Sequence, residues 1–285
     1  MKRSEFRLLD RLRVRWAEID AQQIVFNAHY LSYFDTAVAA YWRALAMPYA
    51  QTMAALGGDL YVRKATLEYL GSARYDEVLD IGIRCACVGT SSMTWVGAVF
   101  RQDELLVTGE LVYVFAEVAT QRAKPVPQAL RDTLSAFESG EPMLEVCVGS
   151  WSELGREAQA VRTAAFVEEQ KIAAALEWDS ADANCVHAVA RNRFGQALGA
   201  GRLFEHAPGI ARIGRMAVLH SMRGVGVGGR VLDALSSVAR DRGDREVMLH
   251  AQASAVPFYR RAGFIERGPS FEEAGIAHVE MFRPP

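Results

Sequence analysis

The stretch Arg223-Gly224-Val225-Gly226-Val227-Gly228-Gly229 places four glycines directly before a helical pattern that runs through residues 230–240. Glycines remove side chains from a turn, and the first amides of a helix have no partner inside the helix. Together with the helix dipole, such amides favour an anion. The apolar residues 213–218 upstream predict the preceding strand. The pattern indicates a loop that holds the diphosphate of a nucleotide-like cofactor, although a plain tight turn would also need glycine.

A second pattern follows this loop in the chain. Residues 246–252 predict a short apolar strand, and the helix after it carries Phe258-Tyr259 and ends at Gly263-Phe264. This order resembles the GNAT superfamily of acyl-CoA N-acyltransferases, in which an Arg-x-x-Gly-x-Gly loop precedes a Phe-Tyr-x-x-x-Gly-Phe ending. The resemblance covers residues 143–285, with an entry segment at 161–170, and implies an α/β acyltransferase fold.

The resemblance also implies where acetyl-CoA or another acyl-CoA binds. Two parallel strands, ending at Val218 and Ala251, would splay apart, so that pantetheine pairs with the backbone of the first and loop amides hold the pyrophosphate. The implied binding residues are Met216, Ala217, Val218, Arg223, Gly224, Val225, Gly226, Val227, Gly228 and Gly229. Arg223 would add positive charge, or it is an ordinary surface arginine.

Tyr259 matches the position that protonates the departing CoA thiolate in many family members; the alternative is a core aromatic residue. The general base is left open. The conceivable residues are Glu168, Glu169, His187 and His220. The acceptor would be an amine that the sequence does not identify.

The chain of 285 residues is longer than a usual single domain. Proline and glycine signals interrupt strand-like patterning between residues 119 and 143, with a short polar helix expected from Gln128 to Phe137. We therefore expect one domain at residues 1–120, a linker at 121–142 and a second domain at 143–285.

Charge and cysteine content exclude several classes of protein. The net charge of −2, without a basic run interleaved with aromatics, argues against a nucleic-acid partner. Neither a signal peptide nor a membrane-spanning run is expected, which predicts a soluble, cytoplasmic protein.

The cysteines predict neither a metal site nor disulfides. We expect buried, reduced thiols and no metal, because no histidine or second cysteine pair completes a metal shell beside Cys85 and Cys87. The cysteines are Cys85, Cys87, Cys147 and Cys185.

The first half begins with a strand and one long apolar helix. The helix is expected from about Ala28 and must stop near Met47-Pro48. Four further strands are expected at residues 60–70, 78–88, 92–101 and 105–118, separated by turn signals. The pattern predicts an antiparallel sheet curled around a central helix.

This layout resembles the hotdog-fold acyl-CoA thioesterases of the 4-hydroxybenzoyl-CoA thioesterase type. The family pattern Asp-x-x-Gly-x-Val-x-x-x-x-Tyr maps onto Asp20, Val25 and Tyr30. Two positions depart from it, because Gln23 replaces the usual glycine and Ser72 a frequent proline.

The resemblance implies a site at the amino end of the central helix. Backbone amides of Phe26 and Asn27 would bind the thioester oxyanion, an interaction worth about 10² to 10³ in rate. Asp20 would act as nucleophile or as general base for water, or it is only a loop or capping carboxylate. We expect Glu18 to be solvated and His29 to be a capping or interface group rather than a base.

The sequence thus predicts an α+β chain, with an N-terminal hotdog domain followed by a C-terminal GNAT domain, both handling acyl-CoA. Hotdog domains bury a sheet edge against a second copy, so the resemblance implies a homodimer or homotetramer. The main alternative is that the hotdog half is a non-catalytic acyl-CoA-sensing or dimerisation module. A further alternative is that the second half binds CoA without acetylating anything.

Overall fold

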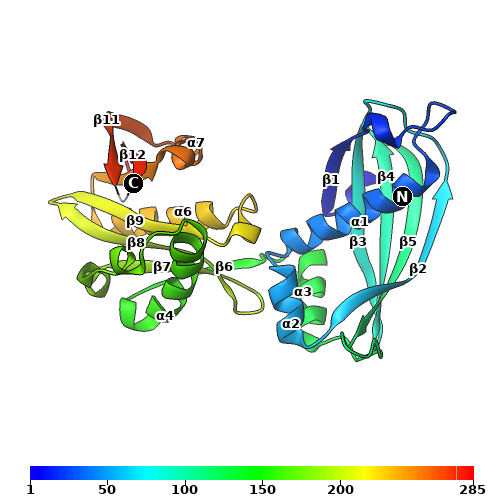
Figure 1. Ribbon diagram of the computed structural model, residues 1–285, viewed down its shortest axis with the longest axis horizontal. Helices are drawn as coiled ribbons and strands as arrows, with labels where there is room; N and C mark the ends of the chain where they lie inside the picture. The colour runs from blue at the N-terminus through cyan, green and yellow to red at the C-terminus, as the bar shows by residue number, and fades with distance from the viewer. Residues whose placement is uncertain (274) are drawn as a thin grey trace. The chain divides into compact units, whose positions relative to one another are not determined.

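The computed structural model describes residues 1–273 and 275–285, and the chain divides into two compact units, Met1–Met143 and Leu144–Pro285 (Figure 1). No helix in the described chain is long and apolar enough to cross a membrane. Each unit has its own sheet, and each is described separately below.

The first unit is one antiparallel sheet curled around a long helix, in the strand order β1-β3-β4-β5-β2 (Figure 1). Its strands are β1 (Leu8–Arg13), β2 (Asp59–Tyr69), β3 (Val78–Val88), β4 (Ser92–Arg101) and β5 (Glu104–Ala116), and its helices are α1 (Asn27–Ala44), α2 (Tyr49–Leu56) and α3 (Gln128–Glu138). The expected strands and central helix are confirmed to within a few residues, except that α2 forms an unpredicted second helix.

Two glycines explain how α1 fits against the sheet. Gly97 and Gly109 face each other across β4 and β5. A Cβ at Gly97 would lie 2.5 Å from Cδ1 of the Phe34 ring, and a Cβ at Gly109 would lie 2.7 Å from Cε2 of the same ring. Phe34 is fully buried, so its ring occupies the space that side chains on these strands would fill. The missing side chains therefore set how closely the helix approaches the sheet.

The segment expected as a linker, residues 121–142, lies within the first unit. Its helix α3 packs on α1, where the Phe137 and Tyr41 rings are 4.7 Å apart, and Glu138 accepts a hydrogen bond from the Tyr41 hydroxyl at 2.6 Å. The polar residues that suggested a linker lie on the exposed side of this helix, and its apolar residues are buried. Along the chain, the boundary between the two units falls between Met143 and Leu144.

Because each unit has its own core, we predict that fragments 1–143 and 144–285 each fold cooperatively. Each fragment should give a single sigmoidal thermal melt by circular dichroism. Two featureless melts would contradict the independence of the units.

The second unit is a seven-stranded sheet in the order β11-β12-β10-β9-β8-β7-β6, with helices packed against it (Figure 1). Its strands are β6 (Leu144–Gly149), β7 (Val186–Asn192), β8 (Ala197–Ala207), β9 (Ile210–Val218), β10 (Glu246–Gln252), β11 (Ile265–Glu273) and β12 (Ile276–Arg283). Its helices are α4 (Trp151–Arg162), which continues as a π-helical segment η3 (Thr163–Glu169), α5 (Ala174–Glu177), α6 (Val227–Arg242) and α7 (Val256–Arg261), and a short 3₁₀ turn η4 (Ser180–Asn184) precedes β7.

The strands and helices predicted around the glycine loop are confirmed. In the described residues β9 and β10 form the one parallel pair of this sheet, and all other neighbours are antiparallel. A parallel pair needs a crossover connection, here α6, which packs on β7, β8 and β9. The glycine loop therefore lies at the carboxyl end of a strand, where α/β sheets bind their ligands.

Candidate functional site

The parallel strands β9 and β10 separate towards their carboxyl ends. Their paired residues run from Ile210 and Glu246 to Ile213 and Leu249. Beyond this point Arg215 has a left-handed φ of 53°, and β9 continues alongside β8 alone, with Ala217 opposite Ala200. In the described chain the backbone of residues 216–218 therefore has no strand partner on the β10 side. This edge consists of Met216, Ala217 and Val218, the residues predicted to pair with pantetheine.

The glycine loop leaves a row of unbonded amides in front of α6. The amide of Arg223 donates to the His220 carbonyl at 3.3 Å, and that of Arg230 donates to the Gly226 carbonyl at 3.1 Å. For the amides between them, residues 224–229, no acceptor lies within hydrogen-bond distance in the described residues. Consecutive free amides at the start of a helix are the expected environment for a phosphate oxygen.

The space in front of these amides is open because of glycine. Gly224 and Gly226 have φ values of 85° and 90°, which other residues adopt at a cost. A Cβ built on Gly226 or Gly229 would meet no described atom within 4 Å. Gly228 is different, since its Cβ would lie 3.4 Å from both Val218 and Phe258. Side chains at Gly226 and Gly229 would therefore extend into open space and not into the protein.

Arg223 is already paired. Its guanidinium makes two parallel bonds of 2.7 Å to the Glu169 carboxylate, at the end of η3. His220 lies near the same carboxylate, with Nδ1 at 3.5 Å. The Arg223 guanidinium holds the pKa of Glu169 below its usual range, which weakens Glu169 as a general base. Arg223 can contact a phosphate only by sharing or releasing this carboxylate.

The two other suggested bases, His187 and Glu168, lie apart from each other in different environments. His187 is almost fully buried, with Nε2 2.8 Å from the Asp182 carbonyl and its ring 4.8 Å from that of Trp151. Burial lowers the pKa of His187, which fits a neutral structural histidine. Glu168 is exposed at the end of the π-helical segment.

Tyr259 lies in α7 with its ring packed against Phe258 and Phe264, at centroid distances of 4.9 and 5.9 Å. Among the described residues its hydroxyl has no hydrogen-bond partner, although the side chain is mostly buried. Burial raises the pKa of Tyr259 well above its usual range, so the hydroxyl stays protonated at neutral pH. A protonated, unengaged hydroxyl is what a proton donor to a thiolate requires.

In the first unit, Asp20 lies in a tight loop before α1. Its amide donates to the Ile24 carbonyl at 2.9 Å, and its Oδ1 accepts from the Gln22 amide at 2.8 Å. Gln23 has a left-handed φ of 62°, which costs a non-glycine residue about 1 to 2 kcal/mol and explains why glycine is usual there. Asp20 is half-buried. Its Oδ1 stabilises the turn, and its Oδ2 makes no hydrogen bond to the described residues.

One of the two expected oxyanion donors is not free. The Phe26 amide donates to the Glu18 carbonyl at 2.9 Å, because the loop closes back on itself before the helix begins. The prediction for Phe26 is therefore wrong. The amides of Asn27 and Ala28, in the first turn of α1, have no acceptor in the part of the chain that the structure describes, which makes this pair the available donors.

Glu18, expected to be solvated, is 3% exposed. Its carboxylate accepts hydrogen bonds from the Arg15 amide at 2.8 Å and from the Tyr33 hydroxyl at 2.7 Å. These bonds fix the loop that carries Asp20 against α1. The contact with Tyr33 joins residues far apart in the chain, so no local pattern marked Glu18 as a positioning residue. His29, whose ring is 6.1 Å from that of Phe26, makes no hydrogen bond through its side chain to the described residues.

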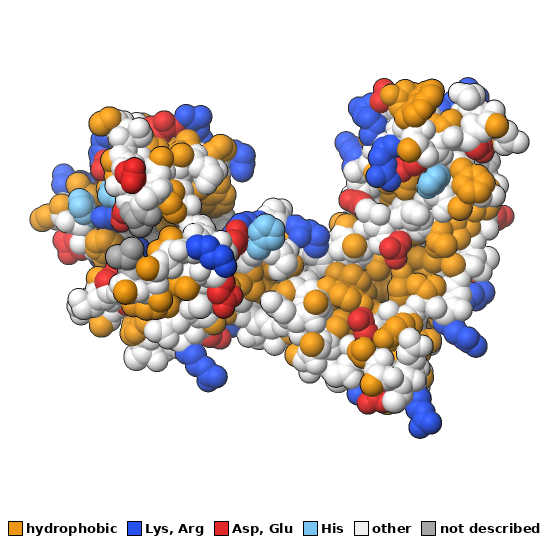
Figure 2. All heavy atoms as spheres, in the orientation of Figure 1, with side chains coloured by type: hydrophobic (Ala, Val, Ile, Leu, Met, Phe, Trp, Pro, Cys, Tyr) orange, Lys and Arg blue, Asp and Glu red, His pale blue; other side chains and the backbone are white. Residues whose placement is uncertain are grey.

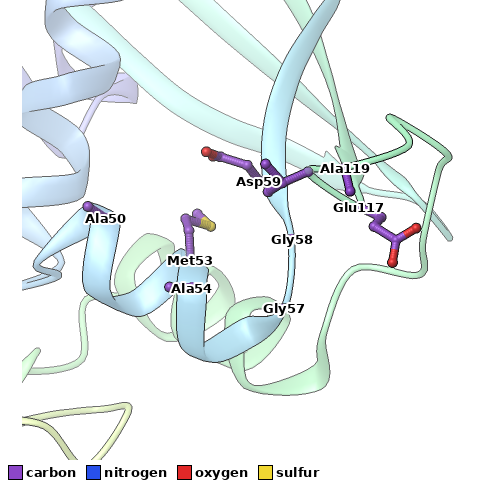
Figure 3. Close-up of a pocket in the computed structure, with 9 residues that line it drawn as sticks. Ala50, Met53, Ala54, Gly57, Gly58, Asp59, Glu117 and Ala119 are labelled. Atoms are coloured by element: carbon purple, nitrogen blue, oxygen red, sulfur yellow. The ribbon is translucent and has the colours of Figure 1, made fainter.

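A shallow hollow between α2 and the ends of β2 and β5 contains none of these residues (Figure 3). Its Asp59 carboxylate is already engaged, since it accepts from the Tyr49 hydroxyl at 2.6 Å and from the Leu60 amide at 2.8 Å.

The four cysteines form no disulfide. Cys185 is buried, but Cys87 is exposed, so the expectation of a buried thiol is wrong for Cys87. The described residues contain no group of three or more potential metal ligands.

Comparison with known proteins gives separate matches for the two units. Residues 14–134 match the family model of the thioesterase-like superfamily, and residues 153–283 match that of the acetyltransferase (GNAT) domain. The uncharacterized N-acetyltransferase YjcF of Bacillus subtilis is 36% identical over 129 residues, which cover 45% of this chain and 91% of that protein. The uncharacterized protein YyaT of the same organism is 31% identical over 130 residues, 44% of this chain and 85% of that protein.

Among solved structures, a thioesterase from Thermus thermophilus, complexed with coenzyme A and Zn, is 24% identical. The match covers 49% of this chain and 98% of the thioesterase, with a TM-score of 0.42.

Proposed function

The chain belongs to the GNAT acetyltransferase family through its second unit and to the thioesterase-like (hotdog) superfamily through its first, and on that premise we propose that it is bifunctional. The first domain hydrolyses an acyl-CoA thioester, and the second transfers an acyl group from acetyl-CoA to an amine. The observation that carries the proposal is the row of unbonded amides at residues 224–229, beside two parallel strands that separate.

Transfer in the second domain needs no covalent enzyme intermediate. The loop amides hold the pyrophosphate, and the open edge of β9 at residues 216–218 holds pantetheine. The amine nitrogen attacks the thioester carbonyl carbon, the C–N bond forms and the C–S bond breaks. The nitrogen loses one proton to solvent, and the Tyr259 hydroxyl gives one to the leaving thiolate and regains it from solvent, so the products are the amide and the free thiol.

Hydrolysis in the first domain would use the start of α1. The thioester oxygen accepts hydrogen bonds from the Asn27 and Ala28 amides, aided by the helix dipole. Asp20 acts as general base for water, or it attacks the carbonyl carbon itself and expels the CoA thiolate, and water then hydrolyses the resulting anhydride and frees Asp20. By either route the products are a carboxylic acid and the CoA thiol. The bond from Gln22 to Oδ1 leaves Oδ2 for this chemistry.

The rival is a first domain that senses acyl-CoA or dimerises without hydrolysing. Gln23 favours it, because the left-handed φ of 62° is a conformation that glycine, the usual residue of catalytic family members at this position, adopts without cost. Steady-state hydrolysis of acyl-CoA thioesters by fragment 1–143 distinguishes the two. Turnover supports the bifunctional enzyme, and tight acyl-CoA binding without turnover supports the sensor.

We also propose that the first domain forms a homodimer or homotetramer through β2. This edge strand is long and mostly exposed, and Val62 and Tyr69 on it are 54% and 50% exposed. Figure 2 shows hydrophobic side chains gathered on the visible face of this unit. Edge strands of this kind pair with another chain unless they are protected.

We predict that the protein sediments as a dimer or tetramer and that Val62→Lys converts it to a monomer, because lysine on an edge strand opposes pairing. The matched control is Val118→Lys, at a valine that is 61% exposed beyond the end of β5. A wild-type monomer, or equal dissociation of both variants, would contradict the β2 interface.

A further inference from the structure

Three arginines lie on neighbouring strands near the point where β9 and β10 separate. Arg202, on β8, bonds Asp179 and Asp182 at 2.7 Å each. Arg215, on β9, bonds Asp179 at 3.1 Å. Both guanidinium groups are therefore neutralised by carboxylates from the segment around η4.

Arg212, the third, has no such carboxylate. Its one hydrogen bond in the described structure runs from Nη2 to His250 Nδ1, at 2.8 Å. The side chain is half-buried, and that burial lowers the pKa of Arg212. A guanidinium carries five N–H donors and keeps its charge in proteins, so most of its donors here are unused. A partly buried charge without a bonded counter-ion is costly unless an anion binds to it.

The bond to Arg212 decides which proton His250 carries. Because the guanidinium donates to Nδ1, the neutral ring holds its proton on Nε2 and offers a second N–H donor. Burial, followed by the nearby Arg212 charge, lowers the pKa of His250 and keeps the ring neutral. Nε2 has no partner among the described residues, and the side chain is 23% exposed.

The pair lies at the opening between the strands. Ile213 and Leu249 are the last paired residues of β9 and β10; Arg212 immediately precedes the first, and His250 immediately follows the second. Aromatic rings flank both groups. The Arg212 guanidinium is 5.8 Å from the centre of the Phe204 ring, and the His250 ring is 4.7 Å from that of Phe271.

We propose that Arg212 and His250 bind a carboxylate of the acceptor, so that the acceptor of this domain is a small amine that carries a carboxylate, such as an amino acid. The inference rests on the proposed acyl transfer and names its substrate class. The remaining guanidinium N–H groups and the Nε2–H would donate to the carboxylate oxygens, in the charge-assisted geometry that arginine favours. In an α-amino acid the nitrogen and the carboxylate share one carbon, which places the amine beside the opening.

Glu273 offers a competing explanation. Its Oε2 lies 3.3 Å from the same His250 Nδ1, so Glu273 and Arg212 would balance each other across the imidazole without any ligand. In that case Arg212 is purely structural. Its replacement would then weaken transfer to every amine equally, whereas a carboxylate site would weaken transfer only to amines with a carboxylate.

The test measures the acceptor-dependent CoA release from acetyl-CoA by the full-length chain, that is, the release with an acceptor minus the release without one, which subtracts hydrolysis by the first domain. Standard L-amino acids and the corresponding amino-acid amides serve as acceptors. The wild type should prefer at least one acid over its amide by at least about tenfold in kcat/KM. Arg212→Gln should lower kcat/KM for that acid at least about tenfold and change the amide less than about threefold. Arg212→Lys should fall between, and Arg240→Gln, at an exposed arginine on α6, should match the wild type.

Equal losses for acid and amide in Arg212→Gln, or amides used as well as acids by the wild type, would overturn the carboxylate site. So would the absence of transfer to either series while calorimetry shows that acetyl-CoA binds. Absence of acetyl-CoA binding is a different result, because it would overturn the proposed acyl transfer itself. A thermal melt of each variant separates these outcomes from misfolding.

Discussion

Gly226→Glu is expected to abolish acetyl-CoA binding by the second domain while hydrolysis by the first continues. The new side chain would point into open space in front of the free amides, where the pyrophosphate is expected. Juxtaposed like charges cost several kcal/mol, so affinity should fall at least about a hundredfold. Calorimetry with fragment 144–285 measures the binding, and CoA release by the full-length chain without an acceptor measures the hydrolysis.

Gly195→Glu is a matched control, because Gly195 also has a positive φ, 74°, and a Cβ there would also meet no described atom within 4 Å. It lies in the turn between β7 and β8, away from the glycine loop. Both variants therefore place a non-glycine residue at a positive φ and add the same charge. Unchanged acetyl-CoA affinity in Gly226→Glu, or an equal loss in both variants, would show that the loop does not bind the cofactor.

Asp20→Asn is expected to lower acyl-CoA hydrolysis at least about a hundredfold while folding and acyl-CoA affinity stay nearly the same. An asparagine oxygen can accept the bond from the Gln22 amide, so the loop should be retained. What is lost is the negative charge that activates water or attacks the carbonyl. Steady-state hydrolysis, with a thermal melt of the same sample, measures both effects.

Asp103→Asn is the control for the loss of one negative charge, since the Asp103 side chain is fully exposed in the turn between β4 and β5. It should hydrolyse acyl-CoA as the wild type does. Full hydrolysis by Asp20→Asn would remove Asp20 from catalysis and leave it as a turn carboxylate.

Local patterns predicted most of the fold. The strand expected at residues 60–70 is β2, Asp59–Tyr69, and the helix expected from Gln128 is α3. Both follow from short-range periodicity and turn residues, which depend on neighbours in the chain. The glycine loop was predictable for the same reason, because left-handed turns and free helix amides are set within a few residues.

The chemistry of the sites was less predictable, because it depends on contacts between distant residues. The Phe26 amide is not available to an oxyanion, because it already donates to the Glu18 carbonyl. The charge of Arg223 is neutralised by Glu169, which belongs to another element. Arg212 and His250 meet only because β9 and β10 pair. Tertiary partners of this kind leave no periodic signal in the sequence.

The most direct test of two separate acyl-CoA sites identifies both products of the full-length chain. Acyl-CoA and an amine acceptor are supplied together, and the free acid and the N-acyl amine are quantified by mass spectrometry for the wild type, Asp20→Asn and Gly226→Glu. We predict both products from the wild type, loss of the acid alone in Asp20→Asn and loss of the N-acyl amine alone in Gly226→Glu. Loss of both products in either folded variant would contradict two independent sites.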